Sequence, residues 1–309
     1  MAERSQAHLM GRPGIGGGGL VDASLERLAS KDNKWLKMFR AALRGTGPGE
    51  GEPLSVEGPK LIEEAVRSGL EVEALLVADA GEPALERILR AAGETEAGIP
   101  RSRILRTTDK LFAGVAGTEA PQGVAALFHQ RNWEFDDVLR GAPPSDGALA
   151  GGVPLVVVMA GIQDPGNVGT VVRSAEAFGA TGAVATKGTA DPWSPKALRA
   201  SAGSALRLPV LRGMAIPVVL AQLRMARLKI YAASAKAIPD STSPQASTAD
   251  LREPSAIFIG SEGAGLPPEV EHAADARISI PISVAVESLN AGVAASVILY
   301  EVARQRKLA

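Results

Sequence analysis

The sequence of 309 residues predicts an α/β protein in which a wound parallel sheet follows a smaller α/β unit. Helical and strand-like spacings alternate from residue 54 onward. The continuous apolar run VPLVVVMA at 153–160 is typical of a strand buried on both faces of a parallel sheet. A stretch rich in Pro and Gly separates the two halves. We therefore expect a Gly-rich tail at 1–22, an N-terminal domain at 23–130, a linker at 131–152 and a C-terminal domain at 153–309.

The N-terminal half begins with a Gly-rich stretch that holds too few large apolar side chains to form a core, which predicts a disordered tail. A long helix is predicted at 24–44 from its apolar spacing, and it carries six basic residues against one acid between 27 and 44. This basic face is either an ordinary solvated surface or a surface that contacts phosphates. The elements expected after it are helices at 59–68, 83–92 and 110–113 and strands at 72–77, 104–107 and 122–128.

The C-terminal half alternates strand and helix throughout, which is the pattern of a parallel sheet wound with helices on both faces. Five strands are expected, at 153–160, 183–186, 229–233, 256–259 and 278–280. Helices are expected at 168–178, 196–206, 217–227 and 289–305.

Composition excludes several kinds of chemistry. The chain has no Cys, which removes disulfides, thiolate nucleophiles and thiolate metal sites. Its three His are too scattered to predict a metal site or a His-based triad. No apolar run approaches the ~20 residues of a membrane span, and the N-terminus lacks the apolar core of a signal peptide. We therefore expect a cytoplasmic protein with no metal and no membrane partner.

The net charge of −1 at first argues against a nucleic-acid partner, but it averages over uneven segments. Residues 192–239 contain no Asp or Glu and eight basic residues. Such a local positive field suits contact with a phosphate backbone, although a charged run is often only a solvated face.

Three loops of the C-terminal half are expected at the carboxyl edge of the sheet, where open α/β sheets bind ligands. They are DPGNVG (164–169) with Arg173 following, GSEGAGL (260–266), and ESLN (287–290). Taken singly, each has an ordinary explanation: Asp164 or Asn167, and Ser288 or Asn290, as helix caps, and glycines as turn residues. Gly169 is expected to pack closely on a strand.

Together these loops resemble the SpoU/TrmH family of RNA ribose methyltransferases, which use S-adenosyl-methionine. The matching segments are DPGNVGTVVRSAEAFGA (164–180), IFIGSEGAGLPPEV (257–270) and ISIPISVAVESLNAGVAASVILYE (278–301). Residues 57–79 resemble the family's small RNA-binding domain, and KDNKWLKMF (31–39) is typical of members that act on large-subunit ribosomal RNA.

The resemblance implies a trefoil knot in the C-terminal domain, a homodimer, and S-adenosyl-methionine as methyl donor. The implied donor-binding residues are Gly260, Ser261, Glu262, Gly263, Ile280 and Leu289. The implied catalytic residues are Arg173, Asn167, Glu262, Ser288 and Asn290. The implied reaction is attack of a ribose 2′-oxygen on the donor methyl. A guanidinium keeps its proton at neutral pH, so we expect Arg173 to bind a phosphate and stabilise developing negative charge rather than act as a base.

One departure stands in the third motif. Many members carry Val-Ser where this chain has Ala291 and Gly292, and we expect the glycine to loosen the start of the helix or widen the donor pocket. The leading hypothesis is 2′-O-methylation of ribosomal RNA, with 23S RNA as the expected substrate. The alternatives are a transfer-RNA methyltransferase and an RNA-binding assembly or resistance factor without activity.

Overall fold

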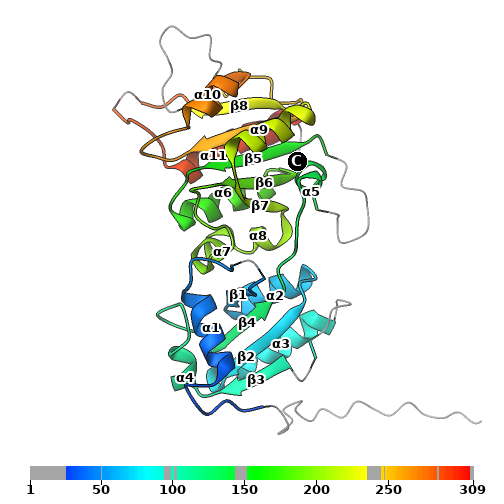
Figure 1. Ribbon diagram of the computed structural model, residues 1–309, viewed down its shortest axis with the longest axis vertical. Coiled ribbons are helices and arrows are strands. Elements are labelled where there is room, and N and C mark those ends of the chain that lie inside the picture. Colours follow the sequence, from blue (N-terminus) through cyan, green and yellow to red (C-terminus); the bar gives the residue numbers. More distant parts are fainter. Residues whose placement is uncertain are drawn as a thin grey trace, which may run out of the picture.

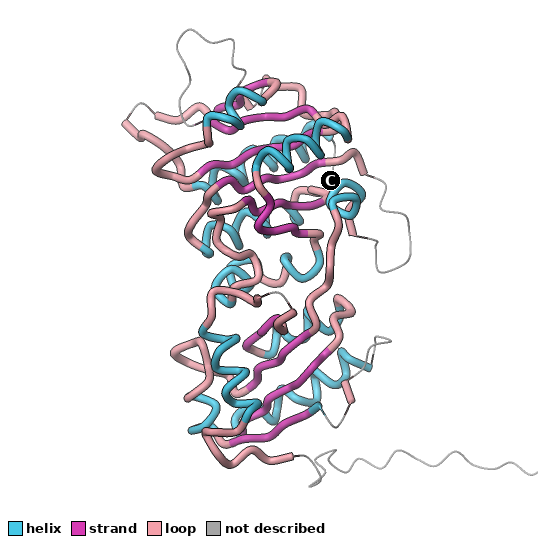
Figure 2. Tube along the Cα trace, in the orientation of Figure 1, coloured by secondary structure: helices cyan, strands magenta, loops and turns pink. Residues whose placement is uncertain are grey.

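The structure is a computed structural model, and it describes residues 26–49, 51–93, 99–100, 103–142, 152–234, 245–246, 248–283 and 285–306. The tail predicted at 1–22 lies outside these residues. The chain forms two lobes, one above the other, each built around its own sheet (Figures 1 and 2). The predicted α/β class and the parallel sheet of the C-terminal half are confirmed.

The lower lobe has a sheet of four strands in the order β1-β4-β2-β3. Neighbours are antiparallel except β2 and β3, which are parallel. The strands are β1 (Leu54–Glu57), β2 (Val72–Ala78), β3 (Ile104–Thr107) and β4 (Val124–Phe128). The helices are α1 (Lys34–Arg44), α2 (Pro59–Arg67), the short η1 (Asp79–Gly81), α3 (Glu82–Gly93) and α4 (Asp109–Ala113).

The helix predicted at 24–44 begins ten residues later than expected. Asn33 caps α1, because its side-chain oxygen accepts a hydrogen bond of 2.8 Å from the amide of Trp35. Residues before it lie along β3 instead, with a bridge between Arg27 and Arg106. The helical apolar spacing of Leu25 and Leu28 with the later residues therefore misled the prediction.

The upper lobe has a six-stranded sheet in the order β10-β8-β9-β5-β6-β7, and all its pairs are parallel. The strands are β5 (Leu155–Ala160), β6 (Gly182–Thr186), β7 (Val210–Met214), β8 (Lys229–Ser234), β9 (Ser255–Gly260) and β10 (Ala276–Ser279). The helices are α5 (Phe135–Arg140), α6 (Pro165–Ala177), α7 (Pro195–Ser201), α8 (Ser204–Arg207), α9 (Ile216–Met225), α10 (Pro268–Ala273) and α11 (Ala291–Arg306).

Strand β5 explains why the run at 153–160 is continuously apolar. Leu155, Val157 and Met159 belong to the buried cluster formed with α6, α7 and α11. Val156 and Val158 belong to the cluster formed with α5 and α9 on the other face. Successive side chains of a strand point to opposite faces, so a strand covered on both sides must be apolar at every position.

Five local features of the upper lobe differ from the prediction. The segment 131–152 is not all linker, because it contains α5, whose Val138 packs against Gly182 of β6. The helix predicted at 196–206 is broken into α7 and α8, with Ala202 at φ 49° and Gly203 at φ 88° between them. Strand β7 and helix α10 were not predicted. Gly169 packs against the carbonyl of Ala197 in α7 rather than against a strand.

The two lobes meet at Arg207. Its Nε and Nη2 donate to Glu176 of α6 at 2.6 and 2.7 Å, and its Nη1 donates to Glu64 of α2 at 2.7 Å. Burial alone would raise the pKa of the Glu176 carboxyl, but the hydrogen bonds from Arg207 outweigh it and hold the pKa below its ordinary value. One guanidinium thus joins the helix of the first motif to the lower lobe.

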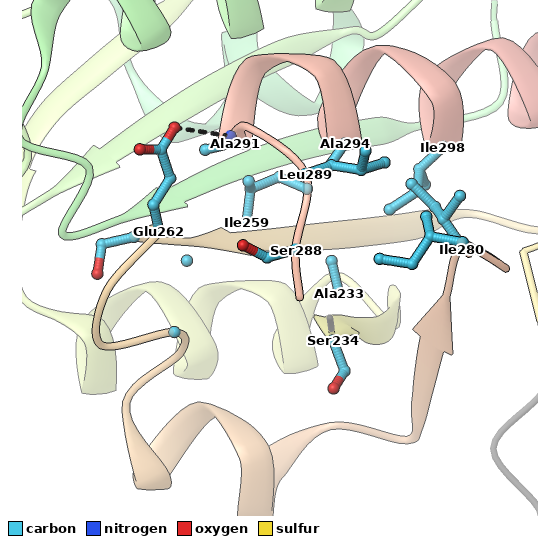
Figure 3. A pocket seen from close by; sticks show the side chains of 14 residues that line it. Ala233, Ser234, Ile259, Glu262, Ile280, Ser288, Leu289, Ala291, Ala294 and Ile298 are labelled. Atoms are coloured by element: carbon cyan, nitrogen blue, oxygen red, sulfur yellow. Dashed lines mark hydrogen bonds between the residues drawn. The ribbon is translucent and has the colours of Figure 1, made fainter. Parts of the chain in front are cut away.

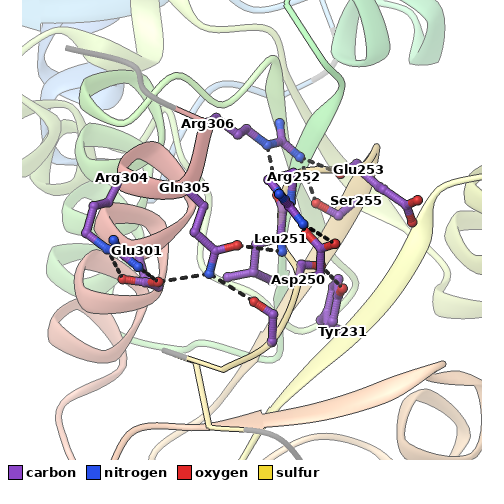
Figure 4. A network of polar contacts seen from close by, with 11 residues as sticks. Tyr231, Asp250, Leu251, Arg252, Glu253, Ser255, Glu301, Arg304, Gln305 and Arg306 are labelled. Atoms are coloured by element: carbon purple, nitrogen blue, oxygen red, sulfur yellow. Dashed lines mark hydrogen bonds and ion pairs between the residues drawn. The ribbon is translucent and has the colours of Figure 1, made fainter.

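A second arginine holds the amino ends of the central strands together (Figure 4). Arg306, near the end of α11, donates hydrogen bonds to the carbonyls of Leu251, Val153 and Glu253 at 2.9, 2.7 and 2.6 Å. It also donates to the hydroxyl of Ser255 at 3.0 Å. Burial lowers the pKa of this guanidinium, and the surrounding carbonyl oxygens compensate for its partial loss of water.

Candidate active site

A pocket lies where the carboxyl ends of β8, β9 and β10 meet the amino end of α11 (Figure 3). Its walls are mainly aliphatic, with three hydroxyl side chains among them. The aliphatic residues include Ile259, Ile280, Ile282, Leu289 and Ile298, and the hydroxyl residues are Ser234, Ser261 and Ser288. An apolar pocket with a few polar groups at the carboxyl edge of a parallel sheet is the usual form of a small-molecule site.

The loop after β9 is closed by its own backbone. The amide of Ser261 donates to the carbonyl of Gly265 at 3.2 Å, and the amide of Gly265 donates to the carbonyl of Ser261 at 2.9 Å. A Cβ on Gly260 would stand 2.4 Å from the carbonyl carbon of Gly265, so only glycine fits at that position. The closed loop presents Glu262 at the edge of the pocket.

Glu262 is the centre of a cluster that joins all three motifs. Its Oε1 accepts hydrogen bonds from Nδ2 of Asn167 at 2.9 Å and from Nδ2 of Asn290 at 2.7 Å. It also accepts from the amide of Ala291 at 3.2 Å (Figure 3). Asn290 further donates to Oδ1 of Asn167 at 2.9 Å. A carboxylate at the amino end of α11 is stabilised by the helix dipole and by these donors.

The two asparagines differ in their relation to helix caps. Asn290 does cap α11, because its Oδ1 accepts from the amides of Gly292 and Val293 at 3.0 and 3.2 Å. Asn167 is not a cap, since Asp164 caps α6 and accepts from the amide of Gly166 at 3.2 Å. The side chain of Asn167 is therefore free to bind Glu262.

A second cavity shares a wall with the pocket and is lined by Gln163, Asp164 and Asn167 among others. Ser261, Glu262 and Ala291 line both spaces. The Nζ of Lys196 lies 2.6 Å from Oδ1 of Asp164, which is part of the cavity wall. Its hydrogen bond holds the pKa of the Asp164 carboxyl below the ordinary value. Glu262 thus lies between an apolar pocket and a more polar one.

The structure brings most of the predicted site residues together. The pocket is lined by Gly260, Ser261, Glu262, Ile280, Ser288 and Leu289. Gly263 lines the neighbouring cavity instead. Sequence reasoning missed Ala233 and Ser234, which line the pocket from the end of β8. The signal was present, because this strand was predicted and its carboxyl end belongs to the same edge of the sheet.

Arg173 is not part of this cluster. It is an exposed residue of α6 and lines neither cavity, and no hydrogen bond or ion pair within the described part of the chain involves it. Its neighbour Ser174 lies 2.6 Å, hydroxyl to hydroxyl, from Ser296 of α11. Arg173 therefore lies on the stretch of α6 that borders α11.

The expectation for Gly292 is corrected. It does not line the pocket but lies buried where α11 crosses α6. A Cβ at this position would stand 2.9 Å from Cγ2 of Thr170. The glycine therefore lets the two helices approach closely, and Ala291 is the residue of this pair that lines both cavities.

The acid-free stretch at 192–239 is less positive in the folded protein than in the sequence. Acids from other segments pair with four of its cations, which are Lys196, Arg207, Arg212 and Arg224. The sequence alone does not show these pairs, so it overstates the open positive charge of this stretch. Within the described ranges, no helix is long and apolar enough to cross a bilayer, and no group of acids and histidines could hold a metal ion.

Comparisons with known proteins agree with the motifs. Residues 154–300 match the SpoU rRNA Methylase family, and residues 51–126 match an MRM3-like substrate binding domain. The chain is 31% identical over 246 residues to 23S rRNA (guanosine(2553)-2′-O)-methyltransferase RlmP of Bacillus subtilis, covering 79% of this chain and 86% of that protein. It is 34% identical to an uncharacterized tRNA/rRNA methyltransferase of Mycolicibacterium gilvum, covering 96% of this chain and 91% of that protein.

Solved structures give the same assignment. An AdoMet-bound rRNA methyltransferase from Sinorhizobium meliloti is similar with a TM-score of 0.73 and 26% identity, over 91% of this chain and 98% of that one. The SpoU methyltransferase AviRb from Streptomyces viridochromogenes is similar with a TM-score of 0.72 and 25% identity, over 89% and 98%. With its motifs, its sheet and its relatives in agreement, the chain belongs to the SpoU rRNA methylase family of RNA methyltransferases.

Proposed function

We propose that this protein transfers a methyl group from S-adenosyl-methionine to a ribose 2′-oxygen of 23S ribosomal RNA. The observation that carries the proposal is the position of Glu262, held by Asn167 and Asn290 between two adjoining cavities. The similarity to RlmP and the match to a substrate-binding domain support the RNA and the ribose oxygen as substrate. With this substrate, we also propose that the protein acts in the cytoplasm.

The two cavities suit the two substrates. The aliphatic pocket would take the methyl donor, with Ile280 and Leu289 against its apolar parts and Ser288 within reach of its polar groups. The polar cavity beside Asn167 would take the nucleotide. The AdoMet-bound relative supports the choice of donor.

The reaction is an in-line displacement. A bond forms between the ribose 2′-oxygen and the methyl carbon while the carbon–sulfur bond of the donor breaks, and the thioether leaves without charge. The hydroxyl proton passes to water or to Oε2 of Glu262 as the oxygen attacks, because a neutral hydroxyl is a weak nucleophile. Oε1 of Glu262 accepts three hydrogen bonds, so the carboxylate chiefly orients Asn167 and Asn290. Its negative charge also attracts the positive charge of the methyl donor.

Arg173 would act on the RNA rather than on the pocket of its own protomer. Its free guanidinium suits a phosphate or a developing alkoxide, both of which it can bind with two hydrogen bonds. The surface beside it supports a homodimer, because Val293, Val297 and Tyr300 of α11 are 47, 40 and 56% exposed. Pairing this face with a second copy would cover the apolar side chains and bring Arg173 to the partner's site.

We further propose the domain division stated from the sequence, with an RNA-binding domain at 23–130 and a methyltransferase domain at 153–309. We also propose the trefoil knot that the family resemblance implies. The segment after β10 returns to the loop of β9 before entering α11, as Ser288 and Leu289 line the pocket beside Gly260, and this course supports a knotted path.

The second candidate is methylation of transfer RNA, which is favoured by the printed names of several relatives as tRNA/rRNA methyltransferases. A strain without the gene separates the candidates. Ribose methylation is mapped on its ribosomal and transfer RNA, before and after complementation with the wild-type gene. We expect one missing methyl group on 23S RNA; a missing methyl on transfer RNA would select the second candidate, and no missing methyl would refute both.

Variants then test the site. Glu262→Gln removes the charge but keeps an oxygen for the asparagines, and we expect at least about a tenfold loss of methylation. Glu269→Gln, on the exposed face of α10, is the matched control and should complement fully. Arg173→Lys tests the guanidinium: near-full turnover would show that its paired hydrogen bonds are not required. Calorimetry should show unchanged donor binding by Arg173→Lys and Glu269→Gln, and weaker binding by Glu262→Gln, which loses the negative charge in the pocket.

A further inference from the structure

The two basic regions of the sequence have opposite fates in the folded protein. Acids from outside the stretch at 192–239 pair with four of its eight cations. In α1, by contrast, Lys34, Arg40 and Arg44 have no carboxylate within ion-pair distance among the residues that the structure describes. Only Lys37 has an acidic neighbour, Asp32 at 3.5 Å, and both side chains are more than half exposed, so this pair contributes little.

The cations of α1 form one row. Leu36, Phe39 and Leu43 bury the inner face of the helix in the lower lobe. At about 100° per residue, the four cations fall within an arc of about 120° on the outer side. They span the eleven residues of the helix, or about 15 Å along its axis. A row of this length faces about four phosphates at the ~3.4 Å axial spacing of a duplex strand.

Two of the four side chains are held in place by the neighbouring loop. Nε of Arg40 donates to the carbonyl of Gly114 at 3.0 Å, and Nε of Arg44 donates to the carbonyl of Ala116 at 3.1 Å. Each guanidinium has five donors, so four remain for a ligand. Because the stems are already fixed, little side-chain entropy is lost when an anion binds.

The row has a fixed relation to the active site. The segment after α1 docks on the upper lobe, where a Cβ on Gly47 would stand 2.5 Å from Oδ2 of Asp191. Both α1 and α7 contact β1. In Figure 1, α1 runs along one edge of the lower lobe toward α7, whose Lys196 pairs with Asp164 in the wall of the polar cavity.

We propose that this outer face of α1, formed by Lys34, Lys37, Arg40 and Arg44, binds the sugar–phosphate backbone of RNA flanking the methylated nucleotide. The inference rests on the proposed RNA substrate. It adds a contact surface outside residues 51–126, which match the substrate-binding domain model. Phosphate contacts of this kind set the register of the RNA on the protein and do not read its bases.

The test compares two double variants of the full-length protein. The first is Lys34→Gln with Lys37→Gln. The control is Arg87→Gln with Arg90→Gln, which removes the same charge from exposed positions of α3 in the same lobe. Binding to an unmodified 23S RNA transcript is measured over a range of salt concentrations. Methyl transfer to that transcript and calorimetry with S-adenosyl-methionine complete the comparison, and thermal melts check folding.

We expect the α1 variant to reduce the slope of log affinity against log salt by about 1.4–1.8, the loss of two phosphate contacts. Its KM for RNA should rise, its donor affinity should not change, and the control should follow the wild type. Equal slopes for the wild type and the α1 variant would overturn the inference. An equal loss of slope in the control would also overturn it. Polyglutamate serves as a probe for an acidic protein partner, and loss of polyglutamate binding with unchanged RNA binding would overturn the inference as well. If the wild type binds RNA but transfers no methyl, the proposed function fails while this comparison still decides the inference.

Discussion

The contact between Gly292 and Thr170 allows a sharp test of how α11 is positioned. A Cβ on Gly292 would stand 2.9 Å from Cγ2 and 3.0 Å from Cβ of Thr170, against the 3.5–4.0 Å or so of a favourable carbon contact. Overpacking of this kind costs about 1–3 kcal/mol, and replacing a helical glycine by alanine returns about 0.5–1 kcal/mol. We expect Gly292→Ala to lower the free energy of unfolding by about 1–2 kcal/mol, measured by urea denaturation.

Two further variants make this result specific. Gly263→Ala is the matched control, because a Cβ at that position meets nothing within 4 Å. Thr170→Ser removes Cγ2 and keeps the hydroxyl that donates to the carbonyl of Gly166 at 2.9 Å, so it should restore part of the loss in the double variant. Methylation should also fall in Gly292→Ala, since its amide bonds to Asn290. Wild-type stability of Gly292→Ala would refute the close contact.

Three other outcomes follow from polar contacts. Arg306→Ala should lower the free energy of unfolding by about 2–4 kcal/mol in urea denaturation, because it leaves several strand-end carbonyls without their donor; a loss below about 1 kcal/mol would contradict this. Arg252 holds the pKa of the Asp250 carboxyl at about 2, so this pair stabilises the fold above pH ~4 and the contribution is lost as pH falls toward 2. A carboxyl NMR titration should show the pKa rising in Arg252→Ala, and an unchanged midpoint would refute the pair. Glu64→Gln should lower the free energy of unfolding by less than about 1 kcal/mol, measured by thermal melts. Arg207→Met should lower it more, because Arg207 also binds the half-buried carboxylate of Glu176 on α6. Equal losses would show that only the contact between the lobes matters.

Much of the upper lobe could be predicted because its signals are local. The apolar run of β5, the cap at Asp164 and the loop after β9 each lie within one short segment, and the rule that ligands bind at the carboxyl edge of a sheet joins them. Strand β7 was missed because only Val210 of it is buried, which leaves no alternation to detect. The break after α7 was missed because Ala202 is a strong helix former that the fold forces to φ 49°.

The rest depends on contacts between distant segments. The neutralisation of Arg224 by Asp275, 51 residues later, cannot be inferred from a list of charges. The role of Gly292 depends on Thr170, and the isolated position of Arg173 depends on the rotation of α6 in the packed protein. For the same reason the similarity of the motifs predicted which residues belong to the site better than it predicted how they lie.

The closed loop after β9 bears on how this protein tolerates mutation. Its shape is set by two backbone hydrogen bonds and by the contact of Gly260 with Gly265, so side chains at its tip do not maintain it. In a saturation-mutagenesis library selected for folding alone, the tip positions from 262 to 264 should accept nearly any residue. Gly260 and Gly265, the latter at φ 69°, should accept almost none. Constraint at position 262 in a library selected for methylation would therefore measure chemistry separately from folding.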